Sequence, residues 1–216
     1  MPIVVATSSD LVDAGIVRSY ARPGGNITGI ADLADESAVK RLELLKSTLP
    51  KTSRVALLTN PDVPPTPKIE KIVGAAAPAL GITLMPIRAT DRASLMSAID
   101  SLAKSRPDAL LVGGDSNATV YARELIKRAT ALRIPVAQYW PGTAEMGALF
   151  SYQTDIRENY RRAASYAVRI LKGAKPGDLP IELPTRYELV VNRKAAKDFG
   201  ITLPYTFLVR ADRVID

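Results

Sequence analysis

Histidine and cysteine are both absent from the 216 residues of this chain. Their absence excludes a Ser–His–Asp triad, a thiol nucleophile, a two-cysteine racemase and an ordinary zinc site. Catalysis would have to come from Asp, Glu, Lys or Tyr, or from a metal held by oxygen ligands. We find neither a paired acidic motif nor a glycine-rich nucleotide fingerprint in the sequence. The sequence therefore predicts no catalytic residue, no cofactor and no metal.

Long hydrophobic runs are missing as well. No apolar stretch approaches the roughly 18 residues that a membrane-spanning helix requires. The first residues, Met1-Pro2-Ile3-Val4-Val5, lack the basic region and the cleavage site of a signal peptide. The chain begins directly on a strand of the buried type, which we interpret as a sign that an upstream segment is missing.

Basic residues exceed acidic ones, with 29 Lys and Arg against 22 Asp and Glu and a net charge of +7. They are dispersed rather than clustered: Arg157, Arg161 and Arg162 share one predicted helix with Asp155 and Glu158. No DNA- or RNA-binding motif accompanies them. The charge therefore indicates solubility and a mild attraction for anionic ligands, and we predict no nucleic-acid partner.

Short apolar strands alternate with amphipathic helices along the chain. The predicted strands are 3–6, 27–30, 54–59, 82–87, 108–112, 134–138, 148–152 and 187–191. The predicted helices are 10–20, 36–49, 67–80, 91–105, 118–132, 156–173 and 193–199. This alternation with short connections predicts an α/β fold of two Rossmann-like lobes with parallel sheets.

The predicted elements divide unequally between the lobes. Residues 36–150 form a complete lobe. Residues 1–35 and 151–190 form part of another, whose first half would precede residue 1. Residues 191–216 form a C-terminal crossover segment.

Small polar clusters follow the predicted strands and open the next helices. Ligands of open α/β sheets bind beyond the carboxyl ends of the strands, where helix N-termini offer unpaired N–H groups. The sequence therefore predicts a small-molecule binder. The candidate ligand-binding residues are Thr7, Ser8, Ser9, Asp10, Thr28, Asn60, Asp115, Asn117, Tyr139, Glu145 and Tyr152.

Each candidate residue could contact the ligand or could have a purely structural role, and both interpretations remain open. The hydroxyls and N–H groups of residues 7–10 could hold a carboxylate or simply cap a helix. Asn60 also opens an Asn-Pro turn, and Asp115 could pair with an ammonium group or cap the helix that follows. Tyr139 and the adjacent Trp140 offer either a cleft wall or core packing.

Thr28 follows a Gly-Gly-Asn turn and is read either as a ligand contact or as a strand residue near a hinge. Glu145 lies in the turn after the predicted strand 134–138, and Tyr152 ends the predicted strand 148–152. We expect these two side chains to face the ligand as well.

Seven stretches, in linear order over essentially the whole chain, carry a resemblance to a known family. They are residues 6–15 (ATSSDLVDAG), 22–29 (RPGGNITG), 40–46 (KRLELLK), 54–61 (RVALLTNP), 170–176 (ILKGAKP), 178–182 (DLPIE) and 187–192 (YELVVN). Together they resemble the periplasmic substrate-binding proteins of ABC transporters, in particular those typified by tryptophan-binding lipoproteins.

The resemblance implies a periplasmic-binding-protein fold and a carrier rather than an enzyme. Two lobes would close about a hinge on an amino acid or similar small carboxylate, and the closed form would dock onto ABC permease subunits. Members are periplasmic or lipid-anchored. This chain matches a member only from the last strands of the first lobe onward and shows no signal sequence, so we interpret it as N-terminally truncated.

Two alternative functions are compatible with the same predicted architecture. An effector-binding domain of a transcription regulator shares this architecture, and a carboxylate-dependent enzyme could be built on it.

An incomplete first lobe would leave an exposed sheet edge, which is prone to pair with another chain. We therefore predict dimerisation or domain swapping that covers residues 1–30.

Overall fold

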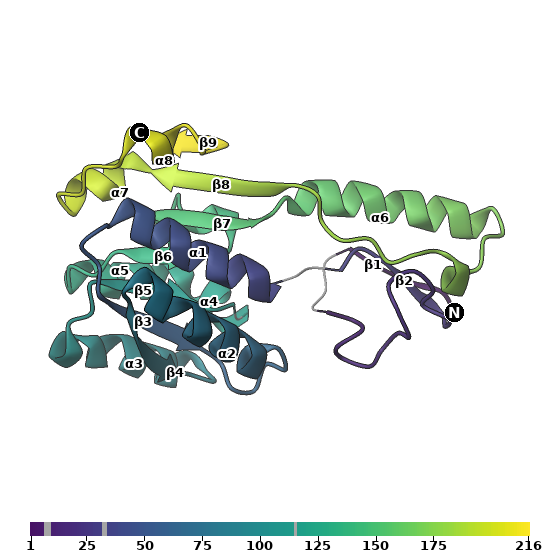
Figure 1. The fold of residues 1–216 in the computed structure, drawn as a ribbon, viewed down its shortest axis with the longest axis horizontal. Helices are drawn as coiled ribbons and strands as arrows, with labels where there is room; N and C mark the ends of the chain where they lie inside the picture. Colours follow the sequence, from purple (N-terminus) through teal and green to yellow (C-terminus); the bar gives the residue numbers. More distant parts are fainter. Residues whose placement is uncertain (7–9, 32–33, 115) are drawn as a thin grey trace. The chain divides into compact units, whose positions relative to one another are not determined.

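The computed structural model describes residues 1–6, 10–31, 34–114 and 116–216 (Figure 1). The strands are β1 (Ile3–Val5), β2 (Ile27–Gly29), β3 (Arg54–Thr59), β4 (Thr83–Arg88), β5 (Ala109–Val112), β6 (Val136–Gln138), β7 (Phe150–Thr154), β8 (Tyr187–Asn192) and β9 (Arg213–Ile215). The α-helices are α1 (Ala34–Thr48), α2 (Thr66–Ala76), α3 (Arg92–Ser105), α4 (Ser116–Val120), α5 (Ala122–Ala131), α6 (Ile156–Leu171), α7 (Arg193–Asp198) and α8 (Tyr205–Leu208). Short 3₁₀ helices are η1 (Ala77–Leu80), η2 (Pro141–Thr143) and η3 (Pro176–Asp178).

The chain divides into two compact units. Unit 1 comprises residues 1–34 and 154–187, and unit 2 comprises residues 35–153 and 188–216. Phe207, within the segment 191–216, is buried in the core of unit 2.

One seven-stranded sheet, in the order β4-β3-β5-β6-β7-β8-β9, forms the centre of unit 2. The strands from β4 to β7 pair in parallel. Strand β8 returns beside β7 in the opposite direction (Figure 1), and Asn192 N donates to Leu149 O where β7 begins. Since β3, β5, β6 and β7 are parallel, their carboxyl ends meet at one edge of the sheet.

Both faces of this sheet are covered by helices. On β3, Val55 and Leu57 pack on the side of α1 and α2, whereas Ala56 and Leu58 pack on the side of α3 and α5. Alternate residues of a strand point to opposite faces, so a strand buried on both sides reads as a continuous apolar run. This is why the strands could be located from the sequence.

Helix α1 packs its apolar face on the sheet as the helical spacing predicts. Leu42 and Leu45 are fully buried, and Val39 and Leu49 pack partly buried against the same core. Arg41, however, is only 1% exposed. A fully buried arginine on this helix is not what its amphipathic pattern suggests.

Unit 1 contains the parallel pair β1–β2 and the long helix α6. Asp155 caps α6 by accepting a hydrogen bond from Glu158 N at 3.1 Å. Ala163 and Tyr166 of α6 pack against Ile30, which follows β2.

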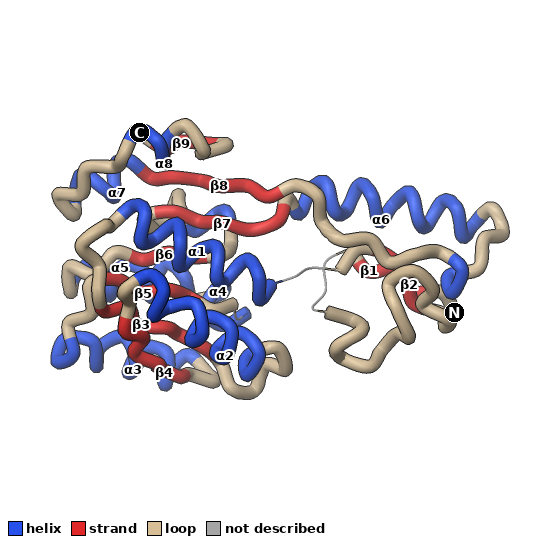
Figure 2. The backbone as a smooth tube through the Cα atoms, viewed as in Figure 1, coloured by secondary structure: helices blue, strands red, loops and turns tan. Residues whose placement is uncertain are grey.

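The helix expected over residues 10–20 is wrong for the residues that the structure describes. Figure 2 draws residues 10–26 as loop, and residues 11–15 make a single turn. Gly15 N donates to Val12 O, Ile16 N donates to Leu11 O, and Gly15 has a φ of +67°. This is the Schellman arrangement that ends helices, so the glycine stops the helix after one turn.

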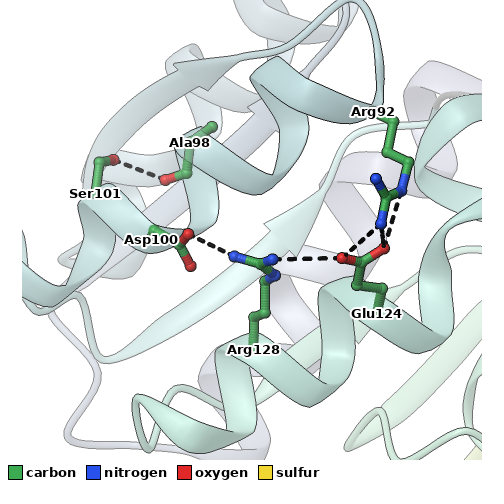
Figure 3. A network of polar contacts seen from close by, with 6 residues as sticks. All are labelled: Arg92, Ala98, Asp100, Ser101, Glu124 and Arg128. Carbon is green, nitrogen blue, oxygen red and sulfur yellow. Dashed lines mark hydrogen bonds and ion pairs between the residues drawn. The ribbon is translucent and has the colours of Figure 1, made fainter.

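An ion-pair network joins α3 and α5 on the outside of unit 2 (Figure 3). Glu124 pairs with two arginines. Its Oε2 lies 2.8 Å from Arg92 Nη2, and its Oε1 lies 3.4 Å from Arg128 Nη2. Arg128 Nη1 also lies 2.5 Å from Asp100 Oδ2. These side chains are part-exposed and lie on helices rather than at strand ends, so they link the two helices at the surface and contribute little to stability.

Candidate ligand site at the carboxyl edge of unit 2

The carboxyl ends of β3 and β6 carry two of the polar and aromatic residues that the sequence singles out. Asn60 follows β3 and Tyr139 follows β6, while two glycines, Gly113 and Gly114, follow β5 between them. Because the three strands are neighbours in the order β3-β5-β6, these residues lie along one stretch of the edge. The structure therefore brings Asn60 and Tyr139 to the same edge of the sheet.

Asn60 is 4% exposed and shapes the turn after β3. Its Oδ1 accepts a hydrogen bond from Asp62 N at 3.0 Å, and its backbone oxygen accepts one from the Thr66 hydroxyl at 2.6 Å. This is the turn-forming use of asparagine. It fixes where α2 begins relative to the end of β3.

Gly113 allows the end of β5 to lie close to the end of β3. A Cβ atom at this position would stand 3.1 Å from Leu58 O and 3.1 Å from the Thr59 methyl carbon. Gly114 has a φ of +121°, a conformation that other residues rarely adopt. The backbone at Gly114 therefore favours glycine, and a side chain at Gly113 would crowd the end of β3.

Arg41 lies beneath this edge and binds backbone oxygens of two strands. Its Nη2 is 3.4 Å from Val112 O and 3.3 Å from Gly113 O, and its Nη1 is 3.3 Å from Tyr152 O. The guanidinium carbon is also 5.8 Å from the centre of the Tyr139 ring. One buried cation thus connects the carboxyl ends of β5 and β7 with the aromatic residue after β6.

Tyr139 is held by hydrogen bonds at both ends. Its hydroxyl is hydrogen-bonded to the Thr119 hydroxyl, and its backbone N–H donates to Gln138 Oε1 at 2.8 Å. Trp140 comes next and leaves 40% of its surface exposed. A large exposed aromatic side chain beside a rigid one is suited to stacking against a flat ligand.

A model of the family described as "ABC transporter substrate binding protein" matches residues 1–215. The chain belongs to this family. A curated relative, the tyrosine-binding protein of Clostridioides difficile, is 27% identical over 199 residues. The match covers 91% of this chain, which spans 56% of the length of that relative.

Among solved structures, an ABC domain from Streptococcus pneumonia in complex with L-Trp is 26% identical, with a TM-score of 0.89. The match covers 99% of this chain and 73% of that one. A LacI family transcriptional regulator from Arthrobacter is 20% identical, with a TM-score of 0.64 over 88% of this chain and 68% of that one. At that identity the likeness to the regulator shows the fold alone.

Several of the predicted site residues lie elsewhere or have side chains that are hydrogen-bonded or ion-paired within the fold. Glu145 lies in the turn before β7 and pairs with Arg213. Ala144, its neighbour, accepts a hydrogen bond from Asn192 where β8 ends. Since β8 is antiparallel to β7, this is the opposite edge of the sheet. The structure does not bring Glu145 together with Asn60 and Tyr139, because a residue that precedes a parallel strand lies at its amino end.

Asn117 and Tyr152 are near the edge but their side chains serve the fold. Asn117 Nδ2 donates to Thr90 O at 2.7 Å, which ties α4 to the loop before α3. The Tyr152 ring packs on the core beside α1. Burial raises the pKa of the Tyr152 phenol, so this group stays protonated.

In unit 1, Asp10 and Thr28 likewise have structural partners. Asp10 Oδ1 accepts hydrogen bonds from Val12 N and Asp13 N, both at 3.0 Å. Thr28 is fully buried, and its hydroxyl donates to Leu179 O at 2.8 Å. The remaining predicted residues, Thr7, Ser8, Ser9 and Asp115, lie outside the described residues.

Within the described parts of the chain, no group of three or more acidic side chains is placed to hold a metal ion. Over the same parts, no helix has the length and apolar character needed to cross a membrane.

Two residues of this edge were missed by the sequence analysis. Arg41 lies among other charged residues of α1, and that sequence pattern does not predict that its side chain is buried. Gln153 of β7 is 8% exposed, and its Oε1 has no hydrogen-bond partner among the residues that the structure describes. A lone glutamine in a strand has no spacing or motif that would single it out.

Proposed function

We propose that this chain is the solute-binding component of an ABC uptake system and that it binds an aromatic amino acid. The carboxyl edge of the unit 2 sheet would supply one wall of the site. The supporting observation is the exposed ring of Trp140, set beside the hydrogen-bonded Tyr139 at this edge. The names of two relatives, one tyrosine-binding and one in complex with L-Trp, agree with this ligand class.

The same proposal covers partners and place of action. The carrier would deliver its solute to ABC permease subunits and would catalyse no reaction itself. It would act in the periplasm or attached to the membrane by a lipid. The family to which the chain belongs supports these proposed features.

Calorimetric titration with L-Trp, L-Tyr and L-Phe tests the ligand class. We expect the unaltered chain to bind at least one of them, and Trp140→Leu to weaken binding about tenfold, since an aromatic contact contributes about 0.5–1.5 kcal/mol beyond area burial. Tyr205→Leu is the matched control, because Tyr205 is 79% exposed on α8. Absence of binding to the unaltered chain, or equal affinity of Trp140→Leu, would contradict the proposal.

We also propose that the chain forms a homodimer through unit 1. Strands β1 and β2 form a two-stranded parallel sheet, and Ile3 of β1 is 41% exposed. Two strands are marginal on their own, and an open edge pairs readily with another chain.

Sedimentation velocity over a hundredfold range of concentration tests the dimer. We expect the unaltered chain to dimerise and Ile3→Lys to remain monomeric, because a charge at a strand edge opposes pairing. Val120→Lys in unit 2 is the control, since Val120 is also apolar and 72% exposed. A monomeric unaltered chain across the range would exclude this assembly.

A further inference from the structure

Two buried glutamines lie on neighbouring strands, Gln138 on β6 and Gln153 on β7, and their side-chain amides differ in hydrogen bonding. Gln138 is fully buried and uses both ends of its amide: Oε1 accepts from Tyr139 N at 2.8 Å, and Nε2 donates to Ala118 O at 3.4 Å. Gln153 is also buried, yet within the described part of the chain its Oε1 has no hydrogen-bond partner. Most buried polar atoms are paired, so this exception needs an explanation.

The position of Gln153 places it within the candidate site. Gln138 pairs in register with Ser151, so Gln153 lies two residues further toward the carboxyl edge. The Ser151 hydroxyl donates to Pro141 O in the loop after β6, whereas Phe150 and Tyr152 pack on the opposite face of the sheet. By strand alternation, Gln153 is on the face of Ser151 and Gln138, next to the strand end that carries Tyr139 and Trp140.

The chemistry of the unpaired atom defines the group that it can bind. An amide oxygen only accepts, so its partner must carry an N–H or O–H. A carboxylate cannot satisfy it. Indole, phenol and ammonium groups can, and all three occur in aromatic amino acids.

We infer that Gln153 Oε1 accepts a hydrogen bond from an N–H or O–H of the bound solute and so determines specificity. This inference rests on the proposed function and identifies a residue that recognises a donor group of the solute. The free protein keeps an unsatisfied buried acceptor at this edge, and the solute supplies the missing donor. Sites that hold a substrate donor with a buried acceptor discriminate strongly against analogues that lack it.

The first test needs no ligand. In the free chain we expect Gln153→Met to raise the melting temperature by about 2–4 °C, because it replaces an unsatisfied buried amide with an apolar chain of similar shape. Gln138→Met is the matched control and should lower the melting temperature by at least as much, since it breaks two hydrogen bonds. The transition is followed by the fluorescence of Trp140, the single tryptophan. A fall for Gln153→Met similar to that for Gln138→Met would overturn the inference.

The second test compares L-Trp, L-Tyr and L-Phe by calorimetry on the unaltered chain and on Gln153→Met. About tenfold weaker binding of L-Trp or L-Tyr, with L-Phe within twofold, would assign the contact to the ring N–H or O–H. Equal weakening of all three would assign it to the ammonium group and also support the inference. Unchanged affinity for every solute that binds would overturn it.

Different measurements test the proposed ligand class and the role of Gln153. If the unaltered chain binds none of the three amino acids, the ligand class is wrong. The melting temperatures then decide the inference on their own, because they depend on the buried amide and not on the identity of the solute.

Discussion

Replacing Arg41 with methionine is expected to lower the free energy of unfolding of unit 2 by about 3 kcal/mol or more. Arg41 is 1% exposed and donates to the Ser37 hydroxyl and to three backbone oxygens, those of Val112, Gly113 and Tyr152. Methionine would fill the space but leave these acceptors without their donor. The loss should be large because each buried acceptor is deprived of its partner away from water.

Urea denaturation followed by Trp140 fluorescence measures this effect. Arg123→Met is the matched control: Arg123 is exposed on α5, and its replacement should change stability by no more than about 0.5 kcal/mol. Arg41→Lys should fall between the two, because an ammonium keeps the charge but cannot span acceptors on two strands as the planar guanidinium does. A loss for Arg41→Met close to that of the control would mean that these long contacts contribute little.

Replacing Phe207 with alanine is expected to cost about 3–5 kcal/mol of unit 2 stability. Phe207 is 2% exposed, and its ring meets Phe150 edge-on, with the ring centres 5.7 Å apart and the planes at 67°. The substitution removes this aromatic contact and leaves a cavity in the core beside α1 and α2.

Tyr205→Ala provides the comparison within the same short helix. Tyr205 is 79% exposed, so its removal should cost little. Denaturation in urea, with the same fluorescence signal, compares the two variants. Equal and small losses would show that the C-terminal segment contributes little to the core, as a separate crossover segment would behave.

The layers of the fold follow from the sequence because burial on both faces leaves an unambiguous pattern. The continuous apolar runs at 54–59 and 109–112 are strands, and the spacing of Leu42 and Leu45 places one face of α1 on the core. The burial of Phe207 could not be predicted from the sequence, because one apolar aromatic residue in a short stretch after Pro204 gives no periodicity. Residues 10–20 were misjudged because the apolar spacing favours a helix, while Gly15 in a left-handed conformation ends it.

The candidate site was only partly predictable. The strand-end rule located Asn60 and Tyr139, since it depends on topology alone. It could not show that the side chains of Asn117 and Thr28 are occupied by backbone partners, as these contacts join residues far apart in sequence. Nor could it place Glu145, which lies at the opposite edge of the sheet, because the rule does not tell a turn before a strand from one after it.

The division of unit 2 into two stretches of chain has a consequence for biosynthesis. The core that contains Leu42, Val55 and Leu111 also contains Leu189 and Phe207, which are made last. A chain still attached to the ribosome would hold residues 35–153 with this core unfinished until residues 188–216 had emerged. We therefore expect unit 2 to complete its folding only after that second stretch is available, which leaves the nascent chain open to chaperones and to proteases until then.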